Sequence, residues 1–204
     1  MRSLFWPKLA VHAAALAPFA WLLVDIWNDA LGADPIQTIT HRTGDWTLRF
    51  VLIALSVTPL RRISGWSVLA RFRRLLGLYA FFYGCLHFAT YLVLDLGGYW
   101  AQILEDVVKR PYITVGFLAW VGLLLLASTS TQGMVRRLGR RWAQLHKLAY
   151  VVGVLGVLHY LWLVKADIRE PLLYGVILGV LLVSRIPPIA RRIERRRRPA
   201  QRGA

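Results

Sequence analysis

The sequence predicts an all-α polytopic membrane protein, a helical bundle of six transmembrane helices with both termini on the cytoplasmic side. Three observations lead to this prediction: 57% of the 204 residues are hydrophobic, the apolar residues gather into six windows, and the cations are unevenly shared between the connecting segments. An ordinary soluble domain of this size is less apolar. A helix needs about 20 apolar residues to cross about 30 Å of hydrocarbon, and the windows approach that length.

The six windows end where charged residues, proline or glycine interrupt the apolar runs. Proline is tolerated in the first turn of a helix and elsewhere marks an end or a kink, so Pro111 and Pro171 open spans and Pro18 kinks the first one. The stretch "HRTGDW" predicts the helix start of the second span, with Thr43 or Asp45 as N-cap. The predicted spans are residues 9–31, 46–60, 75–94, 111–127, 142–164 and 171–186.

The distribution of charge gives the predicted orientation. With the N-terminus inside, the inner segments hold all but six of the 26 lysines and arginines. The six outer cations are Arg42, Arg49, Lys109, Arg110, Lys165 and Arg169. Of the ten acids, only Glu194 falls on the inner side. Because cytoplasmic segments are enriched in Lys and Arg, the sequence predicts an N-in, C-in topology.

The loops are short, so we expect residues 1–188 to form one membrane domain and residues 189–204 a basic cytoplasmic tail. A tail such as "RRIERRRRPAQR" directly after a membrane helix favours anionic lipid headgroups over nucleic acid as its partner. The chain contains no GxGxxG or GxxxxGK[ST] motif, no defensible Ser/His/Asp arrangement and no evident internal repeat. We therefore assign no catalytic residue and expect the function to lie in the bilayer or with partner proteins.

The chain has five histidines: His12, His41, His87, His146 and His159. Polar side chains in hydrocarbon are costly and usually face a cavity, a partner or a cofactor, which makes His87 and His159 candidates. The third and fifth spans are parallel. His87 lies 13 residues after Arg74, and His159 lies 13 residues after His146, a rise of about 20 Å in each helix. His87 and His159 should therefore share an outer level, and His146 an inner level with Arg73 and Arg74.

Two histidines at one depth on neighbouring helices suit the two axial positions of a heme, so His87 and His159 are predicted heme-iron ligands. Hydrogen bonding between helices is the alternative role for this pair. Zinc is a weaker alternative, because no Cys and His cluster at zinc-finger or HExxH spacing exists.

His146 suggests a second, inner heme layer, so the number of hemes, one or two, stays open. The histidine inventory gives it no opposite ligand. Arg73 or Arg74 would take that place or bind propionates, and a protonated arginine suits propionate or lipid phosphate better than a metal. Thirteen residues miss a common helix face by about 140°, so stacking His146 under His159 requires a local distortion or a rotation between the two sites.

Five blocks resemble one family: "HRTGDW", "TPLRR", "RRLLGLYAFFYGCLH", "KRPYITVG" and "STSTQGMVRRLGRRWAQLHKLAYVVGVLGVLHYLW". They are similar to the MsrQ (YedZ) family, the heme-binding membrane subunits of the bacterial periplasmic protein-methionine-sulfoxide reductase system. The chain is more distantly similar to the ferric reductase-like transmembrane domain. His87, His146 and His159 fall on the histidines that this family uses for heme b, which implies that residues 1–188 are a heme-binding domain.

The resemblance implies a role in the bacterial inner membrane. The family takes electrons from quinones and passes them through heme to a periplasmic molybdopterin-containing methionine sulfoxide reductase, which repairs oxidised proteins. Methionine sulfoxide is a reversible lesion, so an electron supply outside the cytoplasm has a use. The resemblance also implies FMN, although no residue identifies its site. A self-contained heme ferric or quinone reductase is one alternative, and a non-redox membrane anchor or transporter is another.

Overall fold

The computed structural model describes residues 4–164 and 166–200, which form helices joined by turns and short loops. The helices are α1 (Phe5–Trp27), α2 (Pro35–Ser64), a 3-10 turn (Ser67–Arg71), α3 (Arg73–Thr90), a π-helical turn (Tyr91–Asp95), α4 (Trp100–Lys109), α5 (Pro111–Ser128), α6 (Gln132–Leu138), α7 (Arg140–Leu145), α8 (Leu148–Leu163), α9 (Arg169–Val183) and α10 (Pro187–Ala200). The described residues contain no strand, which confirms the prediction of an all-α fold.

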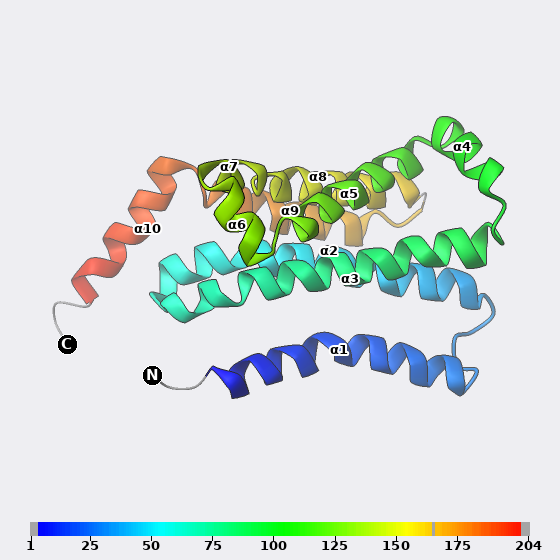
Figure 1. Ribbon diagram of the computed structural model, residues 1–204, viewed down its shortest axis with the longest axis horizontal. Helices are drawn as coiled ribbons and strands as arrows, with labels where there is room; N and C mark the ends of the chain where they lie inside the picture. The colour runs from blue at the N-terminus through cyan, green and yellow to red at the C-terminus, as the bar shows by residue number, and fades with distance from the viewer. Residues whose placement is uncertain (1–3, 165, 201–204) are drawn as a thin grey trace.

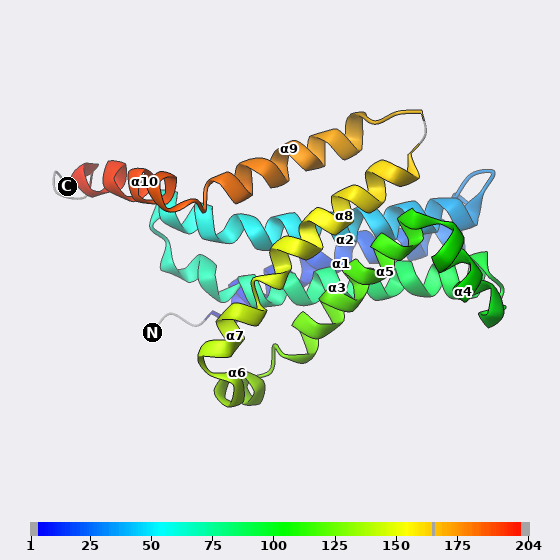
Figure 2. The ribbon, with the colours of Figure 1, turned by 90° about the horizontal axis from the view of Figure 1, so that it is seen from above.

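The centre of the molecule is a unit of four helices built from two pairs. α2 packs along α3, and α5 packs along α8. Contacts between α3 and α5 and between α2 and α8 join the pairs, while α9 covers α2 and α8 (Figure 2). α1 forms a separate layer at the edge of the bundle, and the start of α1 lies toward the same end of the molecule as α10 (Figure 1).

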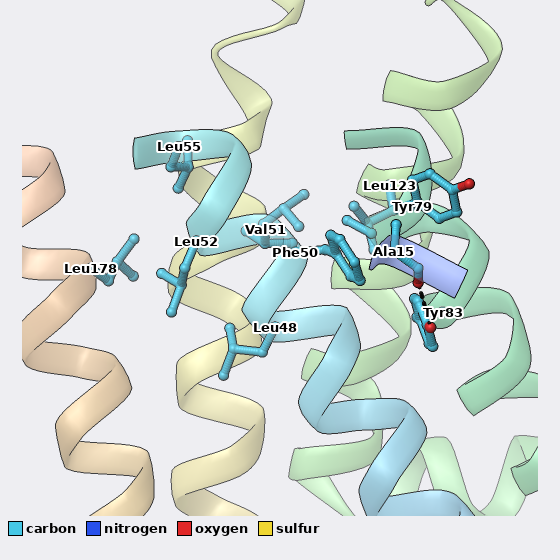
Figure 3. Close-up of a cluster of buried hydrophobic side chains, with 12 residues drawn as sticks. Ala15, Leu48, Phe50, Val51, Leu52, Leu55, Tyr79, Tyr83, Leu123 and Leu178 are labelled. Atoms are coloured by element: carbon cyan, nitrogen blue, oxygen red, sulfur yellow. Dashed lines mark hydrogen bonds between the residues drawn. The ribbon is translucent and has the colours of Figure 1, made fainter. Parts of the chain in front are cut away.

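The core lies around α2, which contributes side chains to several neighbours at once (Figure 3). Phe50 stacks on Tyr83 of α3, with ring centroids 5.3 Å apart. Leu55 of α2 and Leu178 of α9 both come close to Gly153 of α8, where the absent side chain lets the three helices approach. Lipid tails are as apolar as the side chains, so no hydrophobic effect drives membrane helices together. Close packing of this kind therefore supplies much of the attraction between them.

Pro18, where we predicted a kink, lies inside α1 beside a side chain from another helix. The buried hydroxyl of Tyr83 accepts a hydrogen bond from the Phe19 amide at 3.1 Å. It donates one to the Ala15 carbonyl at 2.8 Å (Figure 3). These two backbone groups are four residues apart, so the hydroxyl is inserted into the hydrogen-bond ladder of α1 beside the proline. Tyr83 therefore fastens α1 to α3.

The predicted start of the second helix is wrong by almost three turns. α2 begins at Pro35, and the carboxylate of Asp34 caps it by accepting from the Gln37 amide at 2.9 Å. An Asp N-cap followed by Pro at the first helical position is a common helix start, and it overrides the later signal in "HRTGDW". Thr43 lies inside the helix and bonds back to the Ile39 carbonyl at 2.7 Å.

By length and composition, four helices in the described residues can cross a membrane, which identifies a membrane protein. They are Phe5–Trp27, Ser67–Asp95, Pro111–Ser128 and Arg140–Leu163. A fifth results if Arg169–Val183 and Pro187–Ile193, which meet at 81°, form one broken span. The prediction of six spans is not confirmed, because α2 carries charged residues along its length and is not among these candidates.

Candidate functional site

His87 of α3 and His159 of α8 face each other, as their predicted common depth requires. Their ring centroids are 6.1 Å apart, and the two ring planes are inclined at 77°. A bond between a metal and an imidazole nitrogen is about 2 Å long, so two imidazoles on opposite sides of one iron have centroids about 6 Å apart. The spacing of the two rings is therefore the one that a heme iron needs.

Both rings are oriented by the same kind of hydrogen bond. Nδ1 of His87 lies 2.9 Å from the Thr40 carbonyl of α2, and Nδ1 of His159 lies 2.7 Å from the Tyr112 carbonyl of α5. A carbonyl only accepts, so each Nδ1 carries the proton and each Nε2 keeps its lone pair. Histidines that ligate metals are usually oriented in this way through their other nitrogen.

These contacts bear on the alternative that the two histidines serve only to join helices. Each ring does bond to a neighbouring helix, but it uses only Nδ1 for this purpose. Within the described part of the chain, no hydrogen bond reaches Nε2 of either ring. The chemistry of the donor set, two neutral imidazoles with free Nε2 atoms at the required spacing, fits the two axial positions of a heme.

The two rings line one cavity between α2, α3, α5 and α8. Its deeper wall is apolar and includes Val51, Leu123 and Val152. Besides the two histidines, its polar lining comes from the start of α2 and α5, the π-helical turn after α3 and the end of α8. It includes Thr40, His41, Asp45, Thr47, Tyr91, Asp95, Arg110, Tyr112 and Tyr160. The cavity is thus apolar at depth and polar at the end of the bundle where these termini meet.

Arg110 is the arginine at the polar end of this cavity. Its guanidinium lies 3.3 Å from the carboxylate of Asp106, and this carboxylate raises the pKa of Arg110 above its usual value. Asp106 is buried and also accepts a hydrogen bond from Tyr91 at 2.9 Å. The end of the cavity therefore carries a permanent cation held by a buried acid.

A second cavity brings together the residues of the predicted inner layer. It is lined by His146, Arg73 and Arg74, with Lys147 and Arg185 as further cations. The common lining brings His146 together with the two arginines, which agrees with the expectation that they share a level. Nε2 of His146 lies 3.2 Å from the Thr129 hydroxyl. The lining contains no second histidine, so the described residues supply no imidazole opposite His146.

The helical hydrogen-bond pattern is interrupted at His146. α7 ends at Leu145, residues 146 and 147 form a turn, and α8 begins at Leu148. The indole of Trp142 stacks on the His146 ring, with centroids 4.0 Å apart. The helix is thus interrupted at His146 itself, whereas Gly153 and Gly156 lie inside the continuous helix α8.

Comparison with known proteins shows the family of the chain. Residues 43–157 match the family described as "Ferric reductase like transmembrane component". The chain is 59% identical over 190 residues to the protein-methionine-sulfoxide reductase heme-binding subunit MsrQ of Xanthomonas euvesicatoria pv. vesicatoria (strain 85-10), which covers 90% of this chain and 87% of that protein. The chain belongs to the MsrQ family.

Two other MsrQ proteins give the same result. The protein of Xanthomonas oryzae pv. oryzae (strain MAFF 311018) is 60% identical over 186 residues, which cover 88% of this chain and 85% of that protein. The protein of Herminiimonas arsenicoxydans is 53% identical over 182 residues, which cover 88% and 84%. The resemblance seen in the five sequence blocks is thereby confirmed.

In this MsrQ-family chain, Gly44 and Gly116 are site residues that the sequence reasoning missed. Each lies directly against one histidine ring, Gly44 against His87 and Gly116 against His159. Each glycine lies 43 residues before its histidine and on a different helix, so its place against the ring follows from how the helices pack and not from a local motif.

The described residues offer no other metal site of the usual kind. No group of three or more His, Cys, Asp or Glu side chains gathers among them to hold a metal ion. Cys85, the one cysteine of the sequence, is partly buried in α3 and unpaired.

Proposed function

We propose that this chain is a heme-binding electron-transfer subunit, with His87 and His159 as the axial ligands of a b-type heme. The observation that carries this proposal is the pair of imidazoles at 6.1 Å, each with Nδ1 on a backbone carbonyl and Nε2 left free. The MsrQ relatives are named as heme-binding subunits, which agrees with this assignment. An iron with two histidine ligands accepts and gives up one electron without exchanging ligands.

The protein's own part in this function is to hold and shield the two ligands. The Thr40 and Tyr112 carbonyls fix the proton of each ring on Nδ1 and so direct each Nε2 lone pair toward the other ring. Apolar residues such as Leu123 and Val152 exclude water from the deep part of the cavity. A low-polarity surrounding and fixed axial ligands are the means by which a protein sets a heme potential.

We propose that the chain has six spans in the bacterial inner membrane, with α2 as the sixth and both termini in the cytoplasm. Neighbouring helices surround α2, so its hydropathy need not match that of a lipid-facing helix. The positive-inside distribution of Lys and Arg supports the orientation. Residues 1–188 would then be the heme-binding membrane domain and residues 189–204 a basic tail on anionic lipid headgroups, with no nucleic-acid partner.

We propose that electrons pass from quinones through heme to a periplasmic molybdopterin-containing methionine sulfoxide reductase subunit. The relatives are named as subunits of a protein-methionine-sulfoxide reductase, and the outer segments of this chain carry nine of its ten acids, a surface suited to docking. Sulfoxide reduction itself would occur on the partner. FMN and the quinone site stay expectations of the family resemblance, with no residue assigned to either.

We further propose that the inner cavity serves a second heme or an anionic group. Its cations Arg73 and Arg74 would hold propionates or lipid phosphates by charge-assisted hydrogen bonds. His146 would ligate an iron there, in place of its present contact with Thr129.

The experiment is a dithionite-reduced minus oxidised absorption spectrum with heme quantified per chain, on detergent-purified wild type, His87→Ala, His159→Ala and His146→Ala. His12→Ala is the matched control, because His12 contacts Tyr79 and lines neither cavity. We expect b-type bands in the wild type and in the control, and loss of heme in the first two variants. Full heme with unchanged spectra in both would refute the ligand assignment.

The His146→Ala variant decides the heme count. A fall in stoichiometry with the remaining spectrum intact would indicate two layers, and an unchanged stoichiometry would indicate one.

A self-contained heme ferric or quinone reductase is the second candidate, favoured by the match of residues 43–157 to the ferric reductase-like family. Turnover with a soluble ferric chelate in the absence of a periplasmic partner would support it. A wild-type protein without heme, after expression with adequate heme supply, would instead favour a non-redox anchor or transporter.

A further inference from the structure

The two histidines are held by the same arrangement, built twice. In the pair α2–α3, the Thr40 carbonyl bonds to His87, and in the pair α5–α8, the Tyr112 carbonyl bonds to His159. In each pair, the carbonyl residue and the histidine are 47 residues apart in sequence. One helical turn after each carbonyl comes a glycine, and each histidine ends a Gly-x-Leu-His sequence. The site is thus formed by two equivalent helix pairs that face each other.

The glycines leave room for the rings. A methyl group built on Gly116 would lie 2.7 Å from Nδ1 and 2.8 Å from Cε1 of His159. A methyl group built on Gly44 would lie 3.1 Å from both Nδ1 and Cε1 of His87. The first contact forces the ring to move, while the second requires a displacement of a few tenths of an ångström. Each ring is therefore seated on the backbone of the neighbouring helix.

We propose that Gly44 and Gly116 are positioning residues that fix the planes of the two imidazoles nearly perpendicular to each other. A carbonyl holds one edge of each ring, and the glycine surface one turn later limits how the ring can rotate. These two sets of contacts produce the observed angle of 77° between the ring planes of His87 and His159. This inference rests on the proposed function, because the plane of a ligand matters only if the ring binds iron.

The ring planes matter through the iron orbitals. The π orbital of an imidazole is perpendicular to its ring, so parallel rings act on one iron d orbital and perpendicular rings act on two. Perpendicular rings leave these two d orbitals close in energy, which gives a low-spin ferric heme a large g anisotropy. Orientation of axial ligands by surrounding groups is one of the means by which a protein tunes its metal.

The test compares Gly116→Ala and Gly44→Ala with Gly77→Ala. Gly77 lies on α3, the helix of His87, and a methyl group there would meet nothing within 4 Å. For each purified protein we would measure helical content, heme per chain, the midpoint potential and the low-temperature EPR spectrum of the oxidised heme. We expect the lowest-field g value to decrease in Gly44→Ala, to decrease further or disappear with heme loss in Gly116→Ala, and to stay unchanged in Gly77→Ala.

Two results would overturn the proposal. One is that Gly44→Ala and Gly116→Ala both keep the g values, midpoint potential and heme content of the wild type. The other is that Gly77→Ala changes these quantities as much as Gly44→Ala does. If Gly116→Ala fails to fold, Gly44→Ala alone decides, since its closest contact is milder. The outcome is separable from that of the proposed function. A wild type with bis-histidine heme and unaffected glycine variants would refute only the positioning role, whereas a heme-free wild type would refute the function itself.

Discussion

Replacing Tyr83 by Phe is expected to loosen the attachment of α1 to the bundle. The Tyr83 hydroxyl makes two hydrogen bonds to the α1 backbone, to Phe19 at 3.1 Å and to Ala15 at 2.8 Å. Tyr83 is also among the most buried of the described residues. A hydrogen bond between membrane helices contributes about 0.6 kcal/mol on average and a typical protein hydrogen bond about 1 kcal/mol. The two bonds together predict a destabilisation of about 1–2 kcal/mol. If the Phe19 amide bonds directly to the Ala15 carbonyl in the variant, the destabilisation would be smaller.

The assay is reversible unfolding of the detergent-solubilised protein, with the free energy compared between wild type and Tyr83→Phe. Tyr99→Phe is the matched control, because Tyr99 is exposed and its hydroxyl makes no hydrogen bond within the described residues. Protease access to the loop between α1 and α2 should rise in Tyr83→Phe only. A change in free energy below about 0.5 kcal/mol, the least that a lost hydrogen bond usually contributes, would refute the proposed role of the hydroxyl.

Three further changes have expected outcomes. Asp34→Ala removes the N-cap of α2 and should lower the free energy of unfolding by about 0.5–2 kcal/mol; an unchanged value in the same assay would contradict the capping role. Asp106→Asn removes the buried carboxylate that pairs with Arg110 and should destabilise the fold by about 1–3 kcal/mol, with Lys109→Gln, an exposed cation, as control. Arg73→Gln combined with Arg74→Gln should weaken the binding of a heme or a lipid phosphate in the inner cavity. The measurement is the heme and the phospholipid phosphorus retained per purified chain. Retention equal to that of the wild type would exclude both arginines as ligands of either group.

Part of the site was predictable because depth along a helix follows from residue count alone. Each residue adds about 1.5 Å, so the equal offsets of His87 and His159 from the inner ends of parallel spans predicted their meeting. The same count placed His146 beside Arg73 and Arg74. Membership of the MsrQ family was also readable, since five blocks of sequence carry it.

The start of α2 was predicted wrongly because two local signals compete there. Asp34 and Pro35 start α2 well before the stretch "HRTGDW" that we took as its beginning, because both stretches contain plausible caps and the apolar window begins only after the second. The charged residues of α2 likewise leave the six-span prediction unconfirmed, as a helix surrounded by protein need not have the hydropathy of a lipid-facing one.

By itself, the sequence determined that the chain is helical, that it enters a membrane, which family it belongs to and that His87 and His159 meet. The tertiary structure decided which backbone carbonyls orient His87 and His159 and that Gly44 and Gly116 seat their rings. It also showed that Tyr83 enters the ladder of α1. The physical reason is that composition and periodicity act along one helix, whereas lateral position and rotation depend on how side chains of different helices pack together.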